Sequence, residues 1–153
     1  IASGKVHTGF DLIKNFALGA DICNSARAMM LSLGCIQALE CNTNTCPTGV
    51  ATQNPNLYKG LDVNDKRVRV ANFHHETIKS AVELMAAAGI NHPDRLHRSH
   101  IYRRVSANQI QTYAEMYPYL LKGSLIEAPF PKGWELAVME ANENTFDNAI
   151  KYA

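Results

Sequence analysis

The sequence has no long apolar run, no secretory signal and no internal repeat or low-complexity tract. Its most hydrophobic stretch, residues 81–90, is far shorter than the roughly 18 residues that suggest a membrane-spanning helix. The pattern of this stretch instead fits the end of an amphipathic helix. We therefore expect no membrane span within this chain, and we expect a cytoplasmic protein.

The sequence also has no long block of charge of one sign. The net charge is +1, and histidines and apolar residues interrupt the densest basic set. That set consists of Arg95, Arg98, Arg103 and Arg104. A solvated or carboxylate-paired surface explains it more simply than an interface for a polynucleotide. We expect no nucleic-acid partner.

The N-terminal part of the chain has the pattern of a parallel α/β unit. Thr8 can cap a helix over residues 8–20, with Asp11 three positions on as its capping-box partner. Residues 21–25 are short and partly apolar, which fits a buried strand better than a helix. A strand end, a helix and a strand in succession indicate parallel strands joined by a crossover helix.

The remaining pattern is mostly helical. A helix over residues 28–39 would carry Cys35 near its last turn, and residues 42–61 form a long loop rich in Asn, Thr, Pro and Gly. A loop of that length inside a compact domain is usually functional. Further helices are expected over residues 62–88, 93–96, 106–116 and 133–141, the third of them capped by Ser106.

Three of the four cysteines, Cys35, Cys41 and Cys46, stand in the spacing Cys-x5-Cys-x4-Cys. This pattern is more typical of a metal or iron–sulfur site than of a disulfide framework, because pairing would leave one cysteine over. A structural zinc site normally has four protein ligands, whereas a cubane lacking one iron needs three thiolates. A proline also follows the last cysteine, as in bacterial ferredoxins. Cys23 lies outside the spacing, and we expect it to pack in its strand as a small apolar side chain.

Residues 34–50 resemble, nearly residue for residue, the 3Fe-4S ligand loop of the FMN-binding synthase domain of glutamate synthases. Residues 1–11 resemble a phosphate-loop stretch of the same domain, and residues 18–27 resemble its last barrel strand and second phosphate contact. The resemblance is strong over about residues 1–90. The resemblance is specific because one chain contains both the cysteine spacing and two stretches that resemble phosphate loops, in the order that the family would have them.

The resemblance implies a fold, two cofactors and their ligands. The fold would be α/β, a C-terminal fragment of a (β/α)8 TIM barrel, mostly helical in this piece, with one or two short parallel strands. FMN phosphate would be bound by two segments, Ser3, Gly4 and Lys5 in the first and Ser25, Ala26 and Arg27 in the second. Family members with fused amidotransferase parts tend to have glycine where Lys5 stands. The three spaced cysteines would hold a 3Fe-4S cluster that passes electrons to FMN.

The same resemblance implies how the chain is divided and what lies upstream. Residues 1–60 would contain the last βα units with the phosphate loops and the iron–sulfur loop, and residues 61–153 would form a helical extension packing on the barrel. A chain of 153 residues is shorter than the roughly 200 that an eight-stranded barrel needs at least, and it begins with Ile1 inside an apparent strand. We therefore expect a C-terminal piece of a longer protein, inactive when isolated, whose partners include the upstream part of the same barrel.

The parent protein would then be an oxidoreductase that makes L-glutamate by reducing an imine formed from 2-oxoglutarate and ammonia, with the nitrogen supplied as ammonia or from glutamine. Its partners would be a small-molecule substrate and an electron donor, either ferredoxin or a reductase subunit, and it could form an oligomer. The catalytic groups would lie upstream, so no residue of this chain is named as catalytic. Two alternatives remain open: a non-catalytic helical packing or oligomerisation module, and a zinc-binding module that uses the same cysteines with a histidine.

Overall fold

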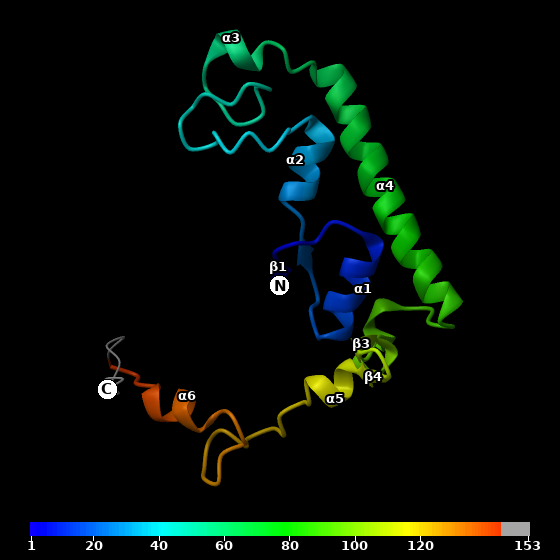
Figure 1. Ribbon diagram of the computed structural model, residues 1–153, viewed down its shortest axis with the longest axis vertical. Helices are drawn as coiled ribbons and strands as arrows, with labels where there is room; N and C mark the ends of the chain where they lie inside the picture. Colours follow the sequence, from blue (N-terminus) through cyan, green and yellow to red (C-terminus); the bar gives the residue numbers. More distant parts are fainter. Residues whose placement is uncertain (145–153) are drawn as a thin grey trace. The chain divides into compact units, whose positions relative to one another are not determined.

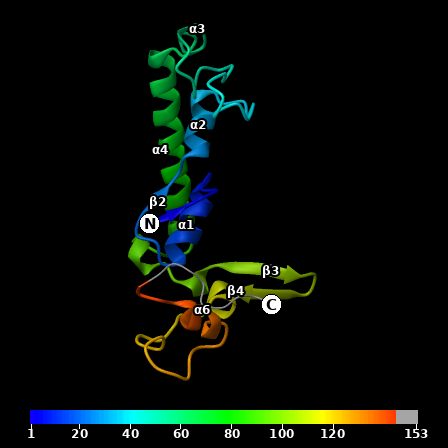
Figure 2. The ribbon, with the colours of Figure 1, turned by 90° about the vertical axis from the view of Figure 1, so that its left-hand side faces the viewer.

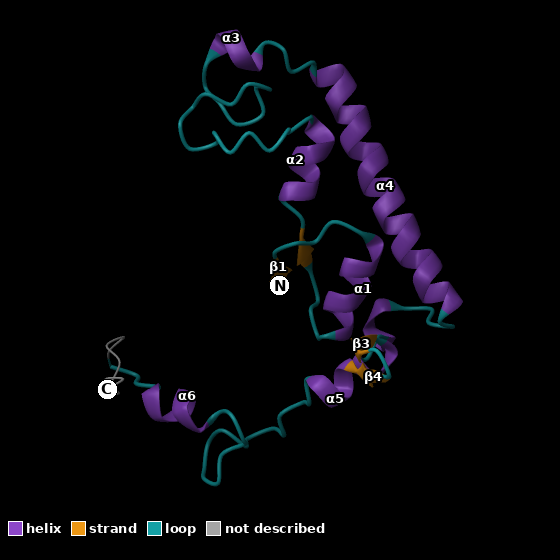
Figure 3. Ribbon diagram, in the orientation of Figure 1, coloured by secondary structure: helices purple, strands orange, loops and turns teal. Residues whose placement is uncertain are grey.

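The computed structural model of the protein describes residues 1–144, which fall into two units, Ile1–Met116 and the described part of Tyr117–Ala153. Helices predominate over strands (Figure 3). The last residues of the predicted extension over 61–153 lie outside the described range. The architecture confirms a mixed α/β chain that is mostly helical and has a short pair of parallel strands.

The N-terminal elements form the predicted parallel unit. Strand β1 (Ala2–Ser3) pairs in parallel with β2 (Cys23–Asn24), and helix α1 (Gly9–Ala17) connects them. In register, Ala2 lies opposite Cys23 and Ser3 lies opposite Asn24. The carboxyl ends of both strands therefore meet at the same edge of the sheet.

Helix α1 begins with the capping box that the sequence predicts. The hydroxyl of Thr8 accepts a hydrogen bond from the backbone N–H of Asp11 at 3.2 Å, and the Asp11 carboxylate accepts one from the N–H of Thr8 at 3.1 Å. The same carboxylate accepts a further bond from the N–H of His7 and pairs with Lys14 at 3.0 Å. One side chain thus satisfies several N–H groups that a helix start leaves without intrahelical partners.

The next elements carry the cysteine-containing loop. Helix α2 (Arg27–Leu33) is followed by a loop, a short helix α3 (Pro55–Tyr58) and the long helix α4 (Val63–Ala87) (Figure 1). The side chain of Asp62 caps α4 by accepting a bond from the N–H of Asn64 at 2.9 Å. The long helix predicted over residues 62–88 is therefore confirmed.

The hydrophobic core of the first unit lies between α1, α4 and the segment that follows α4. Ile13 and Ala17 stand four residues apart on α1, and Ala81 and Met85 stand four residues apart on α4, so each pair lies on one face of its helix. The buried cluster consists of Ile13, Ala17, Ala81, Met85, Ile90, Leu96 and Ile101. It is apolar throughout, and burial of these side chains is the main favourable term in the packing of α1 on α4.

Gly9 allows the backbones of α1 and α4 to come close together. A Cβ atom at this position would stand 2.6 Å from the backbone nitrogen of Ala81 and 2.9 Å from the carbonyl carbon of Ser80. Both distances are shorter than real Cβ contacts, and backbone atoms cannot turn aside as side chains can. The approach of the two helices therefore requires glycine at this position.

The segment beyond α4 corrects one prediction. After two 3-10 turns, η1 (Pro93–Arg95) and η2 (Arg98–His100), the chain forms an antiparallel hairpin of β3 (Tyr102–Ser106) and β4 (Gln109–Thr112), which Figure 2 shows side by side. The helix predicted over residues 106–116 is wrong except for its last turn, α5 (Tyr113–Met116).

The physical reason is the position of the helix cap. Ser106 is the last residue of a strand, and a β-bulge precedes it in the pairing. The true cap is Thr112, whose hydroxyl accepts a bond from the N–H of Glu115, while the Glu115 carboxylate accepts bonds from the N–H and the hydroxyl of Thr112. This reciprocal Thr-x-x-Glu pattern is a capping box, and it starts the helix six residues later than expected.

The second unit has little core of its own. Its helix α6 (Glu135–Glu140) lies within the helix predicted over residues 133–141. None of the residues from 117 to 144 is buried. Exposed apolar side chains include Leu121, Ile126, Leu136 and Met139.

No helix among residues 1–144 combines the length and the apolar character needed to cross a membrane.

We predict that Gly9→Ala destabilises the protein by about 1–3 kcal/mol, because an added methyl group forces α1 away from the α4 backbone. Gly60→Ala is the matched control, since a Cβ there would stand 3.6 Å from the nearest atom, the carbonyl oxygen of Leu57. Urea unfolding followed by circular dichroism measures both changes. Equal midpoints for the two variants would contradict the close-packing interpretation.

We predict that Asp11 makes stability depend on pH between about 4 and 2. Burial alone would raise the pKa of Asp11, but hydrogen bonds from Lys14, His7 and Thr8 outweigh it and lower the pKa to about 2. Because the folded-state pKa is depressed, the stabilisation is present above the unfolded pKa of about 4 and is lost as the pH falls through about 2.

Asp11→Asn should therefore cost about 1 kcal/mol at pH 7 and almost nothing at pH 2. Unfolding free energies measured by urea titration across this range give the difference. A cost that is the same at both pH values would mean that the charge of Asp11 does not contribute.

Candidate functional site

The first predicted phosphate-binding segment is the tight turn that follows β1. Ser3 is the last residue of the strand, and Gly4 and Lys5 both have left-handed backbone conformations, with φ of 95° and 55°. A non-glycine residue adopts such a φ only at a cost, and glycine adopts it freely. The backbone at Lys5 therefore has a conformation that glycine would adopt without that cost.

The second predicted segment joins β2 to α2 and is tied to the first. The hydroxyl of Ser25 donates a hydrogen bond to the carbonyl oxygen of Val6 at 2.7 Å, so the turn after β1 and the turn after β2 are held side by side. Ala26 is the N-cap residue of α2, and it offers no side-chain acceptor to the first N–H groups of the helix. Arg27 is the first residue of α2.

These two segments line one pocket of about 370 Å³. Five of the six predicted phosphate-binding residues line it, and Ser25 instead forms the bond that joins its walls. The full lining is Ser3, Gly4, Lys5, Val6, His7, Asn24, Ala26, Arg27 and Met30. It includes two permanent cations and a histidine but no carboxylate, so the pocket favours an anion.

The pocket lies where parallel α/β folds place their ligands. Loops that follow the carboxyl ends of parallel strands form the binding sites in barrels and in open sheets. Here both loops follow such ends, because β1 and β2 are parallel and in register. The structure therefore places a pocket with a cationic lining at the carboxyl edge of the two parallel strands.

The candidate metal ligands lie on the loop after α2, and one prediction about them is wrong. Helix α2 ends at Leu33, and Gly34 follows in the left-handed conformation, so Cys35 stands just beyond the helix and not in its last turn. The N–H of Cys35 donates to the carbonyl oxygen of Met30 at 3.0 Å. The sulfur of Cys35 accepts a hydrogen bond from the N–H of Gln37 at 3.4 Å.

Cys46 lies in the most polarised environment of the four cysteines. It is buried, and the hydroxyl of Thr48 lies 3.4 Å from its sulfur. Hydrogen bonds from the Thr48 hydroxyl and from the backbone N–H groups of Ala51, Thr48 and Val50 lower the pKa of the Cys46 thiol to about 7. A thiol surrounded by donors in this way is a better thiolate ligand than an ordinary cysteine.

Cys41 differs from the other two, because it is exposed. All four cysteines are free thiols. Within residues 1–144, no three His, Cys, Asp or Glu side chains come together as a metal-binding group. The donor chemistry of the loop fits a three-thiolate site, but its observed conformation does not bring the three sulfur atoms together.

The downstream half of the loop is held by Asn44. Its backbone carbonyl accepts a bond from the hydroxyl of Thr52 at 2.7 Å, and its side-chain oxygen accepts one from the N–H of Gln53 at 2.6 Å. These bonds join residues eight and nine positions apart, so this part of the loop has a defined conformation. The long loop predicted over residues 42–61 is therefore confirmed up to residue 54, and the short helix α3 interrupts its last part.

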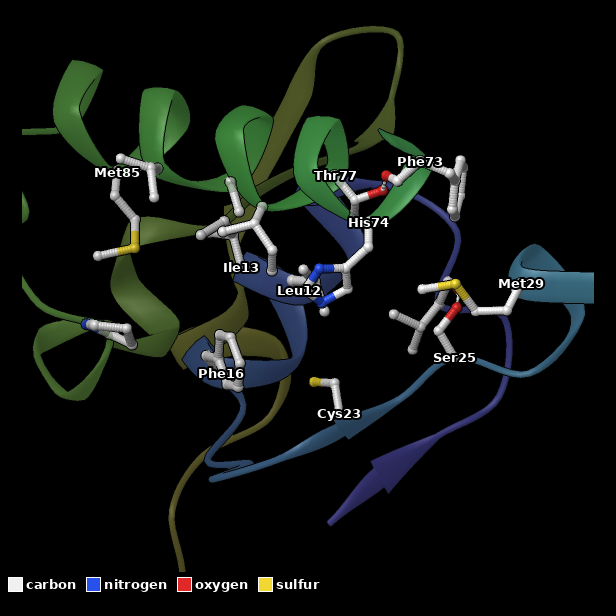
Figure 4. A pocket seen from close by; sticks show the side chains of 15 residues that line it. Leu12, Ile13, Phe16, Cys23, Ser25, Met29, Phe73, His74, Thr77 and Met85 are labelled. Carbon is white, nitrogen blue, oxygen red and sulfur yellow. Dashed lines mark hydrogen bonds between the residues drawn. The ribbon is translucent and has the colours of Figure 1, made fainter. Parts of the chain in front are cut away.

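A second cavity, of about 330 Å³, lies between α1, β2 and α4 (Figure 4). Its lining is almost entirely apolar and includes Phe16 and Met29, and His74 lies among these side chains. Cys23 also lines it, and burial raises the pKa of this thiol. Cys23 is therefore part of the apolar packing of β2, as predicted, and its environment differs from that of Cys46.

Sequence reasoning missed two neighbours of the site. Thr48 was part of the recognised loop, but its contact with Cys46 depends on the fold of that loop. The second is Lys66 of α4. Its ammonium nitrogen lies 3.9 Å from the point where a Cβ atom on Gly34 would stand, and Gly34 directly precedes Cys35. No spacing signal could have revealed Lys66, because 31 positions separate it from Cys35.

The chain is similar to known proteins over its N-terminal part. A family described as "Conserved region in glutamate synthase" matches residues 1–91, more than half of the chain. The glutamate synthase large subunit-like protein YerD of Bacillus subtilis is 48% identical over 103 residues, which cover 67% of this chain and 20% of that protein. An archaeal glutamate synthase (NADPH) of Methanocaldococcus jannaschii is 43% identical over 91 residues, which cover 60% of this chain and 18% of that protein.

The similarity extends to larger enzymes. The glutamate synthase (NADPH) large chain of Bacillus subtilis is 38% identical over 94 residues, which cover 61% of this chain and 6% of that protein. The chain thus spans a fifth or less of the length of these relatives. The matched region includes both predicted phosphate-binding segments and all three spaced cysteines.

We predict that Thr48→Val raises the pKa of Cys46 from about 7 toward its ordinary value near 9, because the hydroxyl is the first of the groups that stabilise the thiolate. The rate of Cys46 alkylation in metal-free protein, measured against pH by peptide mass spectrometry, gives the midpoint. Thr52→Val is the matched control, since Thr52 bonds to Asn44 and not to Cys46. Identical midpoints in the two variants would contradict this assignment.

Proposed function

Because the chain belongs to the glutamate synthase family, whose conserved region it matches over residues 1–91, we propose that it is part of an FMN- and 3Fe-4S-dependent oxidoreductase. The whole protein would synthesise L-glutamate reductively from 2-oxoglutarate, with nitrogen from ammonia or glutamine. This chain would supply the last strands and phosphate loops of a (β/α)8 barrel whose other strands lie upstream. Helices and strands after residue 61 would cover the end of that barrel.

The observation that carries the proposal is the shared pocket of the two phosphate-binding segments. The turn after β1 and the turn after β2 lie at one edge of a parallel sheet, and Lys5, His7 and Arg27 line the space between them. Flavin barrels bind their phosphate between the loops that follow their last two strands. A dianionic phosphate would be balanced there by Lys5 and Arg27, and no carboxylate is among the lining residues.

The residues of this chain would bind and orient the cofactor. Gly4 and Lys5 turn the backbone sharply, and Ser25 fixes the second loop against the first, so the phosphate would have a rigid frame. FMN supplies the hydride chemistry when it is bound, and the protein supplies its position and electrostatic surroundings. The groups that bind 2-oxoglutarate and move its protons would come from upstream segments of the same protein.

Cys35, Cys41 and Cys46 are the proposed ligands of the 3Fe-4S cluster. They are free thiols on a single loop, and the sulfur atoms of Cys35 and Cys46 already accept hydrogen bonds from N–H groups. Such bonds tune the potential of iron–sulfur sites. The cluster would pass single electrons to FMN from a ferredoxin or a reductase subunit.

We predict that Gly4→Val in the whole protein lowers FMN affinity by about tenfold or more, because a β-branched side chain would fill the space between backbone and phosphate. Flavin fluorescence after gel filtration, followed by titration with FMN, measures the change. Gly19→Val is the matched control. Both glycines have positive φ, 95° and 108°, and a Cβ at either position would meet no atom within 4 Å.

Backbone strain is therefore similar in the two variants, and only Gly4 lines the pocket. Equal FMN retention by both variants would refute the phosphate-site assignment.

The visible spectrum of the same preparations tests the other cofactor, because a 3Fe-4S cluster absorbs broadly in the visible region. A colourless protein that contains zinc would support a zinc-binding module instead.

A further inference from the structure

Strand β3 is exposed on both faces and along one edge. All of its residues, Tyr102–Ser106, are exposed, and among residues 1–144 it pairs with no strand other than β4. Strand β4 has further support, because it contacts α5 and η2. Figure 2 shows the hairpin extending away from the long helix α4. A two-stranded hairpin is only marginally stable by itself, and a third strand supplies the pairing that it lacks.

The outer edge of β3 offers backbone groups to such a strand. The N–H of Tyr113 donates to the carbonyl oxygen of Ile101 at 2.8 Å. This bond continues the ladder of the hairpin, in which the neighbouring pair is Tyr102 and Thr112. Hydrogen-bonded and non-hydrogen-bonded pairs alternate along an antiparallel ladder. Tyr102 and Arg104 therefore turn their N–H and C=O groups away from β4, toward the free edge.

The charge of the hairpin indicates what kind of strand fits this edge. Residues 101–112 contain two arginines, Arg103 and Arg104, and no carboxylate. Both are exposed, and neither has an ion pair within the described part of the chain. Arg104 donates to the carbonyl oxygen of Ala107 at 3.0 Å. Because successive side chains of a strand point to opposite faces, each face of β3 presents one guanidinium.

The two arginines disfavour a second copy of this chain as the occupant of the edge. If β3 paired antiparallel with β3 of another copy about its centre, Arg103 would stand opposite Arg103, or Arg104 opposite Arg104. Like charges directly opposite each other destabilise a sheet. The same two charges would form favourable cross-strand pairs with carboxylates, so they select an acidic strand.

We propose that β3 is a docking edge for an extended segment of a partner protein in which two consecutive acidic residues lie between apolar β-branched residues. Arg103 and Arg104 are neighbours, so the residues opposite them on an added strand are neighbours too. Apolar side chains of that segment would pack on Tyr102 and Ile110, which are 68% and 56% exposed and lie on the same face as Arg104. The hairpin lies beyond residues 1–91, which match the glutamate synthase family, so the inference is independent of the proposed cofactor sites.

The first test titrates the whole protein into the fluorescein-labelled peptide Thr-Val-Glu-Glu-Val-Thr and follows fluorescence anisotropy. Arg103→Glu combined with Arg104→Glu should weaken binding by about tenfold or more. The same double variant should instead bind the peptide Thr-Val-Lys-Lys-Val-Thr, which the wild type should not bind, and this rescue shows that the variant is folded.

Arg67→Glu combined with Arg69→Glu is the matched control, because both arginines are exposed on α4 and the change in net charge is the same. This control should bind the acidic peptide as the wild type does. Equal affinity of the wild type for the two peptides, or no saturable binding of the acidic one, would overturn the inference and leave the proposed function standing.

Hydrogen exchange followed by mass spectrometry distinguishes strand addition from simple charge attraction. Saturation with the acidic peptide should increase protection in residues 102–106 by about tenfold and leave α4 unchanged. Binding without added protection in β3 would overturn the docking edge.

Analytical ultracentrifugation of the whole protein tests the competing occupant. The wild type and the double variant at Arg103 and Arg104 should have the same oligomeric state. A wild-type oligomer that the double variant dissociates would assign the edge to a second copy and would overturn the acidic partner.

Discussion

The close contact between α1 and α4 is the constraint on which the first unit depends. The two helices approach so closely at Gly9 that no side chain fits between their backbones, and the apolar cluster forms around this contact. Strand β2 and helix α2 then lie against the surface that α1 and α4 create, with Cys23 and Met29 lining the cavity beside them. A parallel pair of two-residue strands has little stability of its own, so its position depends on this helical support.

The proposed cofactor sites use different parts of that frame. The anion-binding pocket depends on backbone conformation and on one side-chain bond, Ser25 to Val6, which holds two turns together. The cysteine loop depends on helix ends: it starts where α2 stops at Gly34 and finishes before α3. The pocket lies at the N-terminal end of α2 and the cysteine loop begins at its C-terminal end, and both fall within the region that matches the glutamate synthase family.

Local signals in the sequence predicted much of the fold. The pair Thr8 and Asp11 identified the start of α1, and the apolar stripe over residues 62–88 identified α4, because capping and periodicity are properties of neighbouring residues. The hairpin was missed because Ser106 and Thr112 are both possible caps, and only the pairing of β3 with β4 decides between them. In the same way, cysteine spacing predicted three ligands on one loop, but it could not predict the conformation of that loop. The described conformation does not bring the three sulfur atoms together.

The length of α4 has a mechanical consequence. The helix runs unbroken for 25 residues, and Gly9 meets it at Ala81, close to one end. Lys66, which lies beside Gly34 and the start of the cysteine loop, is about 22 Å away along the axis at 1.5 Å per residue. At that distance from Gly9, a tilt of α4 by about 5° would displace Lys66 by roughly 2 Å. If a methyl group added at Gly9 tilts α4, the displacement would thus be largest at the end of the helix that lies beside Gly34 and Cys35.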